Sequence, residues 1–202
     1  MCRWSGQKID QKYVMPALDV TELTRIIGFP PVVDKFVRVL ILGSMPGTAS
    51  LVRNEYYGLR HNAFWRIMGD LFGASADLPY PERLRTLTGH GIALWDVLDS
   101  CYRSGSLDSA IDVRTAKTND FAQLFRDHRA LTHVFFNGKK AANLFEKRVL
   151  PKIDEAGSVK TYATLPSTSP AYASMTYEQK LDRWSEIKTA IALAPAGQPL
   201  DG

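Results

Sequence analysis

The sequence predicts an α/β protein in which a mainly parallel β-sheet is covered by helices on both faces. Three observations predict this class. Short apolar runs rich in β-branched residues recur along the chain, and segments whose apolar residues have helical spacing lie between them. Gly and Pro residues bound both kinds of segment. Runs that are apolar throughout are typical of strands buried on both faces, as in parallel sheets.

The first elements are expected to be a short helix and a strand. A helix over residues 21–27 is expected to end at the Gly-Phe-Pro-Pro run of residues 28–31, because glycine and proline stop helices. Residues 36–42, FVRVLIL, predict a buried central strand. The loop of residues 43–47 follows it, and then a polar stretch that continues to about Arg60.

Two helices and a second strand are expected next. Asn62 can cap a helix over residues 63–72, whose apolar residues recur at helical spacing, and Gly73 can end it. A proline in its first turn favours a shorter helix over residues 82–88. Residues 91–95, GIALW, predict the second buried strand.

The remaining chain begins with a segment that lacks a clear period. Residues 96–117 are polar and rich in Ser and Asp, which predicts an irregular surface segment. Helices and strands then alternate again, with helices expected over residues 119–129, 139–150 and 176–193 and strands over residues 132–136 and 160–165.

Length and composition indicate one domain. The 202 residues are 45% apolar and 23% charged, which is ordinary for a globular protein. We expect a single domain over residues 1–202, with an N-terminal extension at residues 1–35 and a flexible tail at residues 193–202. No apolar run approaches the ~20 residues that cross a bilayer, and the polar start lacks the apolar core of a signal peptide. We therefore expect a cytoplasmic protein without a membrane partner, associated with the nucleoid in a bacterium.

Cysteine, histidine and charge exclude some classes of site. Two cysteines, Cys2 and Cys101, rule out a disulfide scaffold, and the four scattered histidines form no cluster with metal-ligand spacing. We expect neither a metal nor a cofactor. The net charge of +4 and the pI near 9.1 fit a polyanionic partner without requiring one.

Polar segments follow four of the predicted strands, and each has a functional and a structural interpretation. In open α/β sheets ligands bind at the carboxyl ends of the strands. The segments at those ends are residues 43–47, 95–96, 137–138 and 166–172. The two glycines and the proline of residues 43–47 let backbone amides approach an anion, or they form a tight turn. Asp96 can contact a ligand or cap a turn.

The stretch Tyr-Tyr-Gly-Leu-Arg-His-Asn at residues 56–62 is more unusual. Aromatic faces are stacking platforms for bases, and arginine can meet phosphate. For Tyr57, stacking on a base and packing in the core are equally good explanations. For Asn62, binding a ligand and capping the next helix are equally good explanations. The Ser and Thr hydroxyls of residues 165–170 can bind phosphate oxygens or only stabilise a turn. Lys139 and Lys140 can meet phosphate or remain solvated.

Together these segments resemble the uracil-DNA glycosylase superfamily, and most closely its branch of DNA-deoxyinosine (hypoxanthine-DNA) glycosylases. The resemblance covers about residues 38–190 in the order of the family. It is carried by Ile-Leu-Gly-Ser-Met-Pro-Gly at 41–47, Ser-Leu at 50–51, Tyr-Tyr at 56–57, Asn-Ala-Phe-Trp at 62–65, Gly-Ile-Ala-Leu-Trp-Asp-Val-Leu at 91–98 with Ser-Cys at 100–101, Gly-Ser-Leu-Asp-Ser-Ala-Ile at 105–111, Phe-Asn-Gly-Lys-Lys at 136–140 and Leu-Pro-Ser-Thr-Ser-Pro-Ala at 165–171.

The resemblance implies a three-layer α/β/α sandwich and a monofunctional, metal-independent DNA glycosylase. Such an enzyme hydrolyses the N-glycosidic bond of a deaminated base, hypoxanthine or uracil, and leaves an abasic site for base-excision repair. The base must be flipped out of the stack and held by stacking and by hydrogen bonds to its edge. The partner implied is DNA that contains a deaminated base, and the enzyme is expected to be a monomer. Residues 103–117 are expected to become ordered on DNA.

The resemblance also implies roles for individual residues. The catalytic candidates are Asn62, Ser44 and His61. The residues expected in the base pocket are Gly43, Met45, Pro46, Gly47, Tyr57, Trp95, Asp96 and Asn137. Those expected to contact DNA are Arg60, Lys139, Lys140, Ser167, Thr168, Ser169 and Tyr172.

The sequence departs from the pattern of the family at several of these positions. Many relatives have Asp or Asn, which can orient a water, where Met45 stands. The deoxyinosine-type branch shares this Met, and the resemblance implies that Asn62 holds the water or the base there, assisted by backbone amides of residues 43–47. Leu59 stands where relatives have His, and His61 lies two places later. Leu165 replaces the His that opens the last motif of uracil-specific enzymes, which predicts a slower and broader activity.

Two other functions are compatible with the sequence. One is a protein of the same fold that binds damaged DNA with little or no turnover, as Met45 and the missing His suggest. The other is a small-molecule hydrolase or nucleotide-binding α/β protein that uses residues 43–47 to hold a phosphate.

Overall fold

A computed structural model describes residues 24–153 and 161–193 of the protein. The described strands are β1 (Thr24–Ile27), β2 (Val39–Gly43), β3 (Ile92–Asp96), β4 (Leu98–Arg103), β5 (Ile111–Thr118), β6 (His133–Asn137) and β7 (Thr161–Leu165). The described α-helices are α1 (Thr48–Arg53), α2 (Phe64–Phe72), α3 (Tyr80–Gly89), α4 (Phe121–Asp127), α5 (Lys139–Arg148), α6 (Tyr177–Trp184) and α7 (Glu186–Leu193). Two short 3₁₀ helices span Asp108–Ala110 and Leu150–Lys152.

Four strands form a parallel sheet in the order β3-β2-β6-β7. The central strand β2 places Leu42 opposite Trp95 on one side and opposite Phe136 on the other. Every one of these strands overlaps a strand that the sequence predicts, so the predicted mainly parallel sheet is confirmed. Its carboxyl ends lie at one edge, where Gly43 is paired with Asp96 and Asn137 with Leu165.

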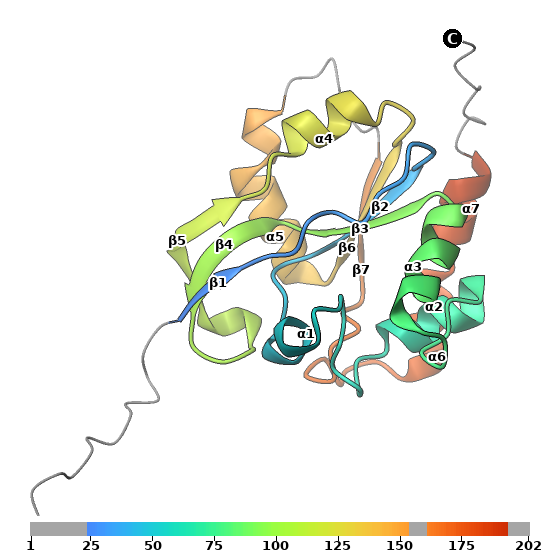
Figure 1. The fold of residues 1–202 in the computed structure, drawn as a ribbon, viewed down its shortest axis with the longest axis horizontal. Coiled ribbons are helices and arrows are strands. Elements are labelled where there is room, and N and C mark those ends of the chain that lie inside the picture. The colour runs from blue at the N-terminus through green and yellow to red at the C-terminus, as the bar shows by residue number, and fades with distance from the viewer. Residues whose placement is uncertain (1–23, 154–160, 194–202) are drawn as a thin grey trace, which may run out of the picture.

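Helices cover both faces of this sheet, which gives three layers (Figure 1). Side chains of successive strand residues point to opposite faces. Accordingly, Leu40 and Leu42 of β2 belong to a core that includes α4 and α5, whereas Val39 and Ile41 belong to a core with α2, α3, α6 and α7. All four side chains are completely buried. The expected three-layer α/β/α sandwich is therefore confirmed.

A second sheet corrects two predictions. Strands β1, β4 and β5 form an antiparallel sheet in the order β1-β4-β5. The irregular segment predicted at residues 96–117 is therefore wrong, because most of it is strand. The helix predicted at residues 21–27 is also wrong where it is described, since residues 24–27 are strand β1; residues 21–23 lie outside the described residues. Pairing with the distant strand β4 stabilises β1 as a strand against its local preference.

Two helix ends follow the sequence signals, whereas the N-cap of α2 is Ala63 and not the predicted Asn62. Gly73 ends α2 in the left-handed conformation with φ of 78°, and Thr176 begins α6 with a capping box to Gln179. The single helix predicted at residues 176–193 is divided at Ser185 into α6 and α7. Helix α1 was not expected. No described helix combines the length and the apolar character that crossing a membrane requires.

Part of the expected N-terminal extension belongs to the folded domain. Strand β1 pairs with β4, and Val32 exchanges backbone hydrogen bonds of 2.9 Å in both directions with Leu94 of β3. Residues 1–23, most of this extension, and the tail after residue 193 lie outside the described residues.

Candidate functional site

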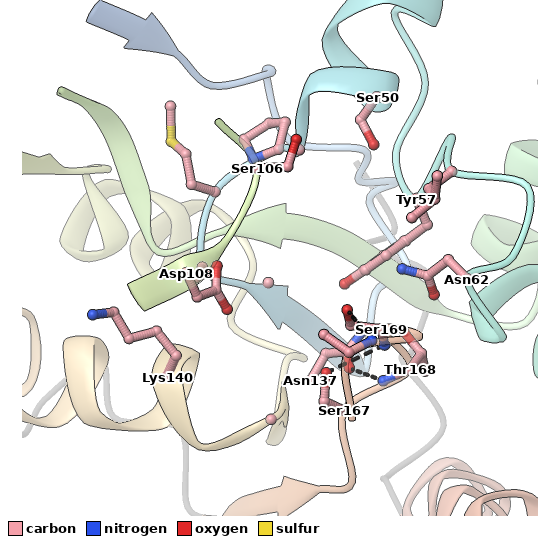
Figure 2. Close-up of a pocket in the computed structure, with 18 of the residues that line it drawn as sticks. Ser50, Tyr57, Asn62, Ser106, Asp108, Asn137, Lys140, Ser167, Thr168 and Ser169 are labelled. Atoms are coloured by element: carbon pink, nitrogen blue, oxygen red, sulfur yellow. Dashed lines mark hydrogen bonds between the residues drawn. The ribbon is translucent and has the colours of Figure 1, made fainter. Parts of the chain in front are cut away.

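A cavity of about 460 Å³ lies at the carboxyl ends of the parallel strands. Two walls enclose much of it (Figure 2). The first wall consists of residues 43–47 and the turn of residues 104–110 between β4 and β5. The second wall is the loop of residues 166–172. Tyr57 and Asn62 lie between these walls, and Asp96 lies on the cavity floor at the end of β3.

The first loop, residues 43–47, approaches β3 so closely that its first residue must lack a side chain. A Cβ atom at Gly43 would lie 2.3 Å from Oδ1 of Asp96 and 3.4 Å from the Tyr57 hydroxyl. The carbonyl of Gly43 accepts a hydrogen bond of 2.9 Å from Val97, and that of Ser44 accepts one of 3.1 Å from Leu98. These bonds fix the loop against the start of β4.

The β4–β5 turn is bonded to this loop by polar side chains. The Ser44 hydroxyl donates to Oδ1 of Asp108 at 2.6 Å. Arg103, only 1% exposed, donates from Nη2 to the carbonyl of Pro46 at 2.6 Å and from Nε to the carbonyl of Gly105 at 2.8 Å. Arginine suits this role because its planar group offers several donors in a fixed geometry.

Asp96 is a buried carboxyl without a full set of partners. The residue is 4% exposed, and its Oδ2 atom has no hydrogen-bond partner among the described residues. Burial, reinforced by the negative charge of Asp108, raises the pKa of Asp96 to about 7, while Arg103 acts in the opposite direction. This carboxyl therefore changes protonation near neutral pH.

Tyr57 and Asn62 are held by the aromatic core beneath them. Tyr57 has the left-handed conformation, with φ of 55°, and its ring stacks on Phe64 with 3.8 Å between ring centroids. The Trp65 indole donates to the carbonyl of Tyr56 at 2.8 Å and so fixes the neighbouring residue. Burial, followed by the charge of Asp96, raises the pKa of the Tyr57 hydroxyl far above its usual range.

Asn62 is half-buried and lines the cavity (Figure 2). Its Oδ1 atom accepts a hydrogen bond of 3.0 Å from the backbone N–H of Phe64, in the first turn of α2. This bond orients the side chain amide. The amide NH₂ group binds no other residue in the described parts of the chain and is available to a ligand.

The second wall is held mainly by Asn137 at the end of β6. Its Nδ2 atom donates to Oγ1 of Thr168 at 2.8 Å, and its Oδ1 atom accepts from the backbone N–H of Thr168 at 2.9 Å (Figure 2). The carbonyl of Thr168 accepts from Ala63 at 3.0 Å, which connects this loop to the start of α2. The Trp184 indole also donates to the carbonyl of Pro166 at 2.9 Å.

Gly138 allows this close approach of the second wall. It has φ of 94°, and a Cβ atom there would lie 3.0 Å from Cβ of Ser167. Oδ1 and one N–H of the Asn137 amide are bonded to Thr168, so Asn137 fixes the loop, while its second N–H is left for another partner at the cavity that Asn137 lines.

Most of the residues that the sequence predicts for the site line this cavity. They are Gly43, Ser44, Met45, Pro46, Gly47, Tyr57, Asn62, Asp96, Asn137, Lys139, Lys140, Ser167, Thr168, Ser169 and Tyr172. Arg60, His61 and Trp95 do not line it. Arg60 and His61 are exposed, and Trp95 packs in the core, where its indole donates to the carbonyl of Phe29 at 3.1 Å.

Sequence reasoning assigned no role to three residues that shape the first wall, Arg103, Leu107 and Asp108. They lie in the segment predicted to be irregular, and the motif at residues 105–111 was the available signal. Among the described residues, no group of three His, Cys, Asp or Glu side chains is placed to hold a metal ion.

Comparisons with known proteins find a family and several relatives of similar sequence. The model of the uracil DNA glycosylase superfamily matches residues 30–191. A hypoxanthine DNA glycosylase from Methanosarcina acetivorans is 38% identical over 133 residues, which are 61% of this chain and 83% of that protein. A hypoxanthine DNA glycosylase from Methanosarcina barkeri is 40% identical over 115 residues, which are 56% of this chain and 72% of that protein.

A solved structure is also similar. It is the solution NMR structure of a candidate uracil DNA glycosylase from Methanosarcina acetivorans, with a TM-score of 0.65 and 32% sequence identity. The match covers 82% of this chain and 99% of that one.

Proposed function

The chain belongs to the uracil DNA glycosylase superfamily, and on that premise we propose that it removes a deaminated base, hypoxanthine or uracil, from DNA in base-excision repair. The names of its relatives support hydrolysis of N-glycosyl bonds in DNA, and those from Methanosarcina favour hypoxanthine as the base. The observation that carries the proposal is the free amide of Asn62 in a cavity at the carboxyl edge of the sheet. A cavity of about 460 Å³ falls in the range of small-ligand sites.

The ring of Tyr57 is proposed to stack on the flipped base. A flipped base is held by stacking and by hydrogen bonds to its edge. One face of Tyr57 already rests on Phe64, so the ring has little freedom to lose when a base stacks on its other side. Asp96 is proposed to contact the base edge, where a carboxyl with a pKa of about 7 can act as donor or acceptor.

Asn62 is proposed to hold the attacking water or the base during bond cleavage. The bond between C1′ and the base nitrogen breaks, its electron pair stays on the base, and water adds to C1′. That water loses one proton to become the C1′ hydroxyl, and the departing base gains one proton. Negative charge therefore develops on the leaving base while the sugar gains oxocarbenium character. Fixed N–H donors aimed at developing charge are among the largest contributors to catalysis. The Asn62 amide and the backbone of residues 43–47 are suited to this role.

The basic and hydroxyl groups around the mouth of the cavity are proposed to bind the DNA backbone. Lys139, Lys140, Ser167 and Ser169 line the cavity, and such groups commonly contact phosphate oxygens. Arg60 is exposed beside the cavity-lining residue Leu59 and is proposed to contact DNA outside the pocket.

Cleavage of lesion-containing oligonucleotides tests this function. Labelled duplexes with one uracil, one hypoxanthine or no lesion are incubated with excess protein without metal, and abasic sites are then cleaved with alkali. We expect breaks at the lesion, and we expect Asn62→Ala to lower the single-turnover rate about 10²–10³-fold, as for other single catalytic donors. Asn143→Ala, which removes an exposed amide from α5, should retain the rate of the wild type.

The result distinguishes the proposed enzyme from a binding protein. If the wild-type protein makes no breaks at long times but still binds lesion DNA selectively, it is a damaged-DNA binder of the same fold. If Asn62→Ala cleaves at the wild-type rate, the role assigned to Asn62 is wrong.

A further inference from the structure

The turn between β4 and β5 carries an apolar side chain to the mouth of the cavity. Leu107 lines the cavity, yet it is 60% exposed. A leucine in this situation leaves apolar surface in water, which is unfavourable unless a partner covers it. This apolar surface beside the cavity is available to a partner from outside the fold.

The two residues beside Leu107 are each bonded to another segment: Ser106 to helix α1 and Asp108 to the first loop. The Ser106 hydroxyl accepts from the backbone N–H of Thr48 at 3.0 Å and donates to its Oγ1 at 2.6 Å. On the other side, Asp108 accepts from the Ser44 hydroxyl at 2.6 Å. The Leu107 side chain is therefore presented by a backbone that is fixed on both sides.

The base of the turn is equally restrained. Gly105 takes the left-handed conformation with φ of 69°, and its carbonyl accepts from the buried guanidinium of Arg103. The carbonyl of Leu107 accepts from the backbone N–H of Ala110 at 3.0 Å, which closes the turn. A side chain on such a turn loses little backbone entropy when it inserts into a partner.

A flipped nucleotide creates the kind of space that such a side chain fills. Extrusion of a base leaves a gap between its neighbours, and unstacking costs a few kcal/mol. Proteins that unstack DNA frequently insert leucine or another apolar side chain between base steps. Tyr172, 36% exposed on the second wall, lies on a separate segment, so the two walls each bring one apolar side chain to the mouth.

We propose that Leu107 is a wedge residue that inserts into the DNA duplex beside the flipped nucleotide. The β4–β5 turn is then a DNA-contacting element as well as a support for the first loop. This inference rests on the proposed glycosylase function, because it assumes that a base leaves the duplex at this cavity. It assigns Leu107 to the opening of the duplex, whereas Asn62 acts on the bond that breaks.

Base unstacking can be measured independently of cleavage. A duplex with 2-aminopurine next to the lesion becomes more fluorescent when the neighbouring stack opens. With saturating protein, we expect this increase for the wild type and at least a threefold smaller increase for Leu107→Ala. Val52→Ala truncates another exposed apolar residue, 82% exposed on α1 and outside the cavity, and should behave as the wild type.

Chemical rescue provides the second readout. We expect Leu107→Ala to lower single-turnover excision from duplex DNA about tenfold, and a bulky pyrene nucleotide opposite the lesion to restore the rate by filling the same space. The proposal would be overturned if Leu107→Ala gave the same fluorescence increase as the wild type. It would also be overturned if pyrene did not restore the lost rate of excision. If the wild type cleaves nothing, the proposed function fails, while the fluorescence assay still decides the role of Leu107.

Discussion

The two walls of the cavity are fixed by different chemistry. The first wall depends on ionisable groups, since Arg103 and Asp108 join the β4–β5 turn to residues 43–47. The second wall depends mainly on neutral groups, the amide of Asn137 and the indole of Trp184. Lys180 adds one bond, from its ammonium to the carbonyl of Tyr172 at 2.7 Å.

The two walls also differ in how completely their polar atoms are satisfied. Nη1 of Arg103, which holds the first wall, and Oδ2 of Asp96, on the cavity floor beside Gly43 of that wall, are buried and lack hydrogen-bond partners among the described residues. In the second wall both ends of the Asn137 amide are used. Unsatisfied buried polar atoms are rare in folded proteins and concentrate at functional sites. The first wall is therefore the part of the site expected to respond to pH and to substrate.

The largest expected effect is the pH response of Asp96, which lies on the cavity floor next to the first wall and is influenced by Asp108 of that wall. Its pKa is about 7 in the folded protein and near 4 in an unfolded chain, so between those values the folded state holds the extra proton. The contribution of Asp96 to stability is therefore highest below about pH 4 and falls as pH rises to about 7. The difference between these two pKa values corresponds to about 4 kcal/mol in the free energy of unfolding.

Urea unfolding of Asp96→Asn measures this effect. The variant has no carboxyl to titrate, so its free energy of unfolding should rise relative to the wild type as pH increases from about 4 to 7. Asp99→Asn, which removes an exposed carboxylate from β4, is the matched control. A constant difference between Asp96→Asn and the wild type across this range would contradict the assignment.

The next effect is the loss of the buried guanidinium. Arg103→Met keeps much of the side-chain volume but leaves the carbonyls of Pro46 and Gly105 without their donor. We expect the free energy of unfolding to fall by about 3 kcal/mol, because these are charge-assisted bonds and unpaired buried acceptors remain. Arg114→Met, at an exposed arginine of β5, should leave the free energy of unfolding nearly unchanged. Equal losses in the two variants would show that the first wall does not depend on Arg103.

The smallest of the three effects concerns the second wall. Asn137→Ala removes both bonds to Thr168 and should lower the free energy of unfolding by about 2 kcal/mol. The loss should be the same at pH 5 and pH 8, since neither partner is ionisable. Asn143→Ala, an exposed position on α5, serves as the reference. A loss that depends on pH would remove the contrast between the two walls.

The sequence predicts the parallel sheet because its strands are marked by composition alone. Residues such as Val39, Leu40 and Ile41 are buried whatever face they point to, and a continuous apolar run records this. Strand β4 has the sequence LDSCYR and a mixed pattern of burial, and β5 carries many polar residues. The pairing of β4 with β1 and β5 depends on contacts with other segments of the chain, and local sequence patterns predict such contacts poorly.

The candidate site is predicted to a similar extent. The segments at the strand ends converge, as the position of parallel strands requires. Sequence alone did not place Trp95 in the core, because a residue at the end of a strand can face either the cavity or the interior. It also gave no role to Arg103, whose guanidinium acts through a turn that was not expected.

The order of the elements along the chain determines when each part of the site is synthesised. Both neighbours of β2 in the sheet, β3 and β6, leave the ribosome after it. Residues 166–172 follow later still, and Thr168 then binds Ala63, next to Asn62. A nascent chain therefore carries Asn62 long before the cavity around it exists. The unfinished chain therefore lacks the second wall of the site until residues 166–172 have been translated.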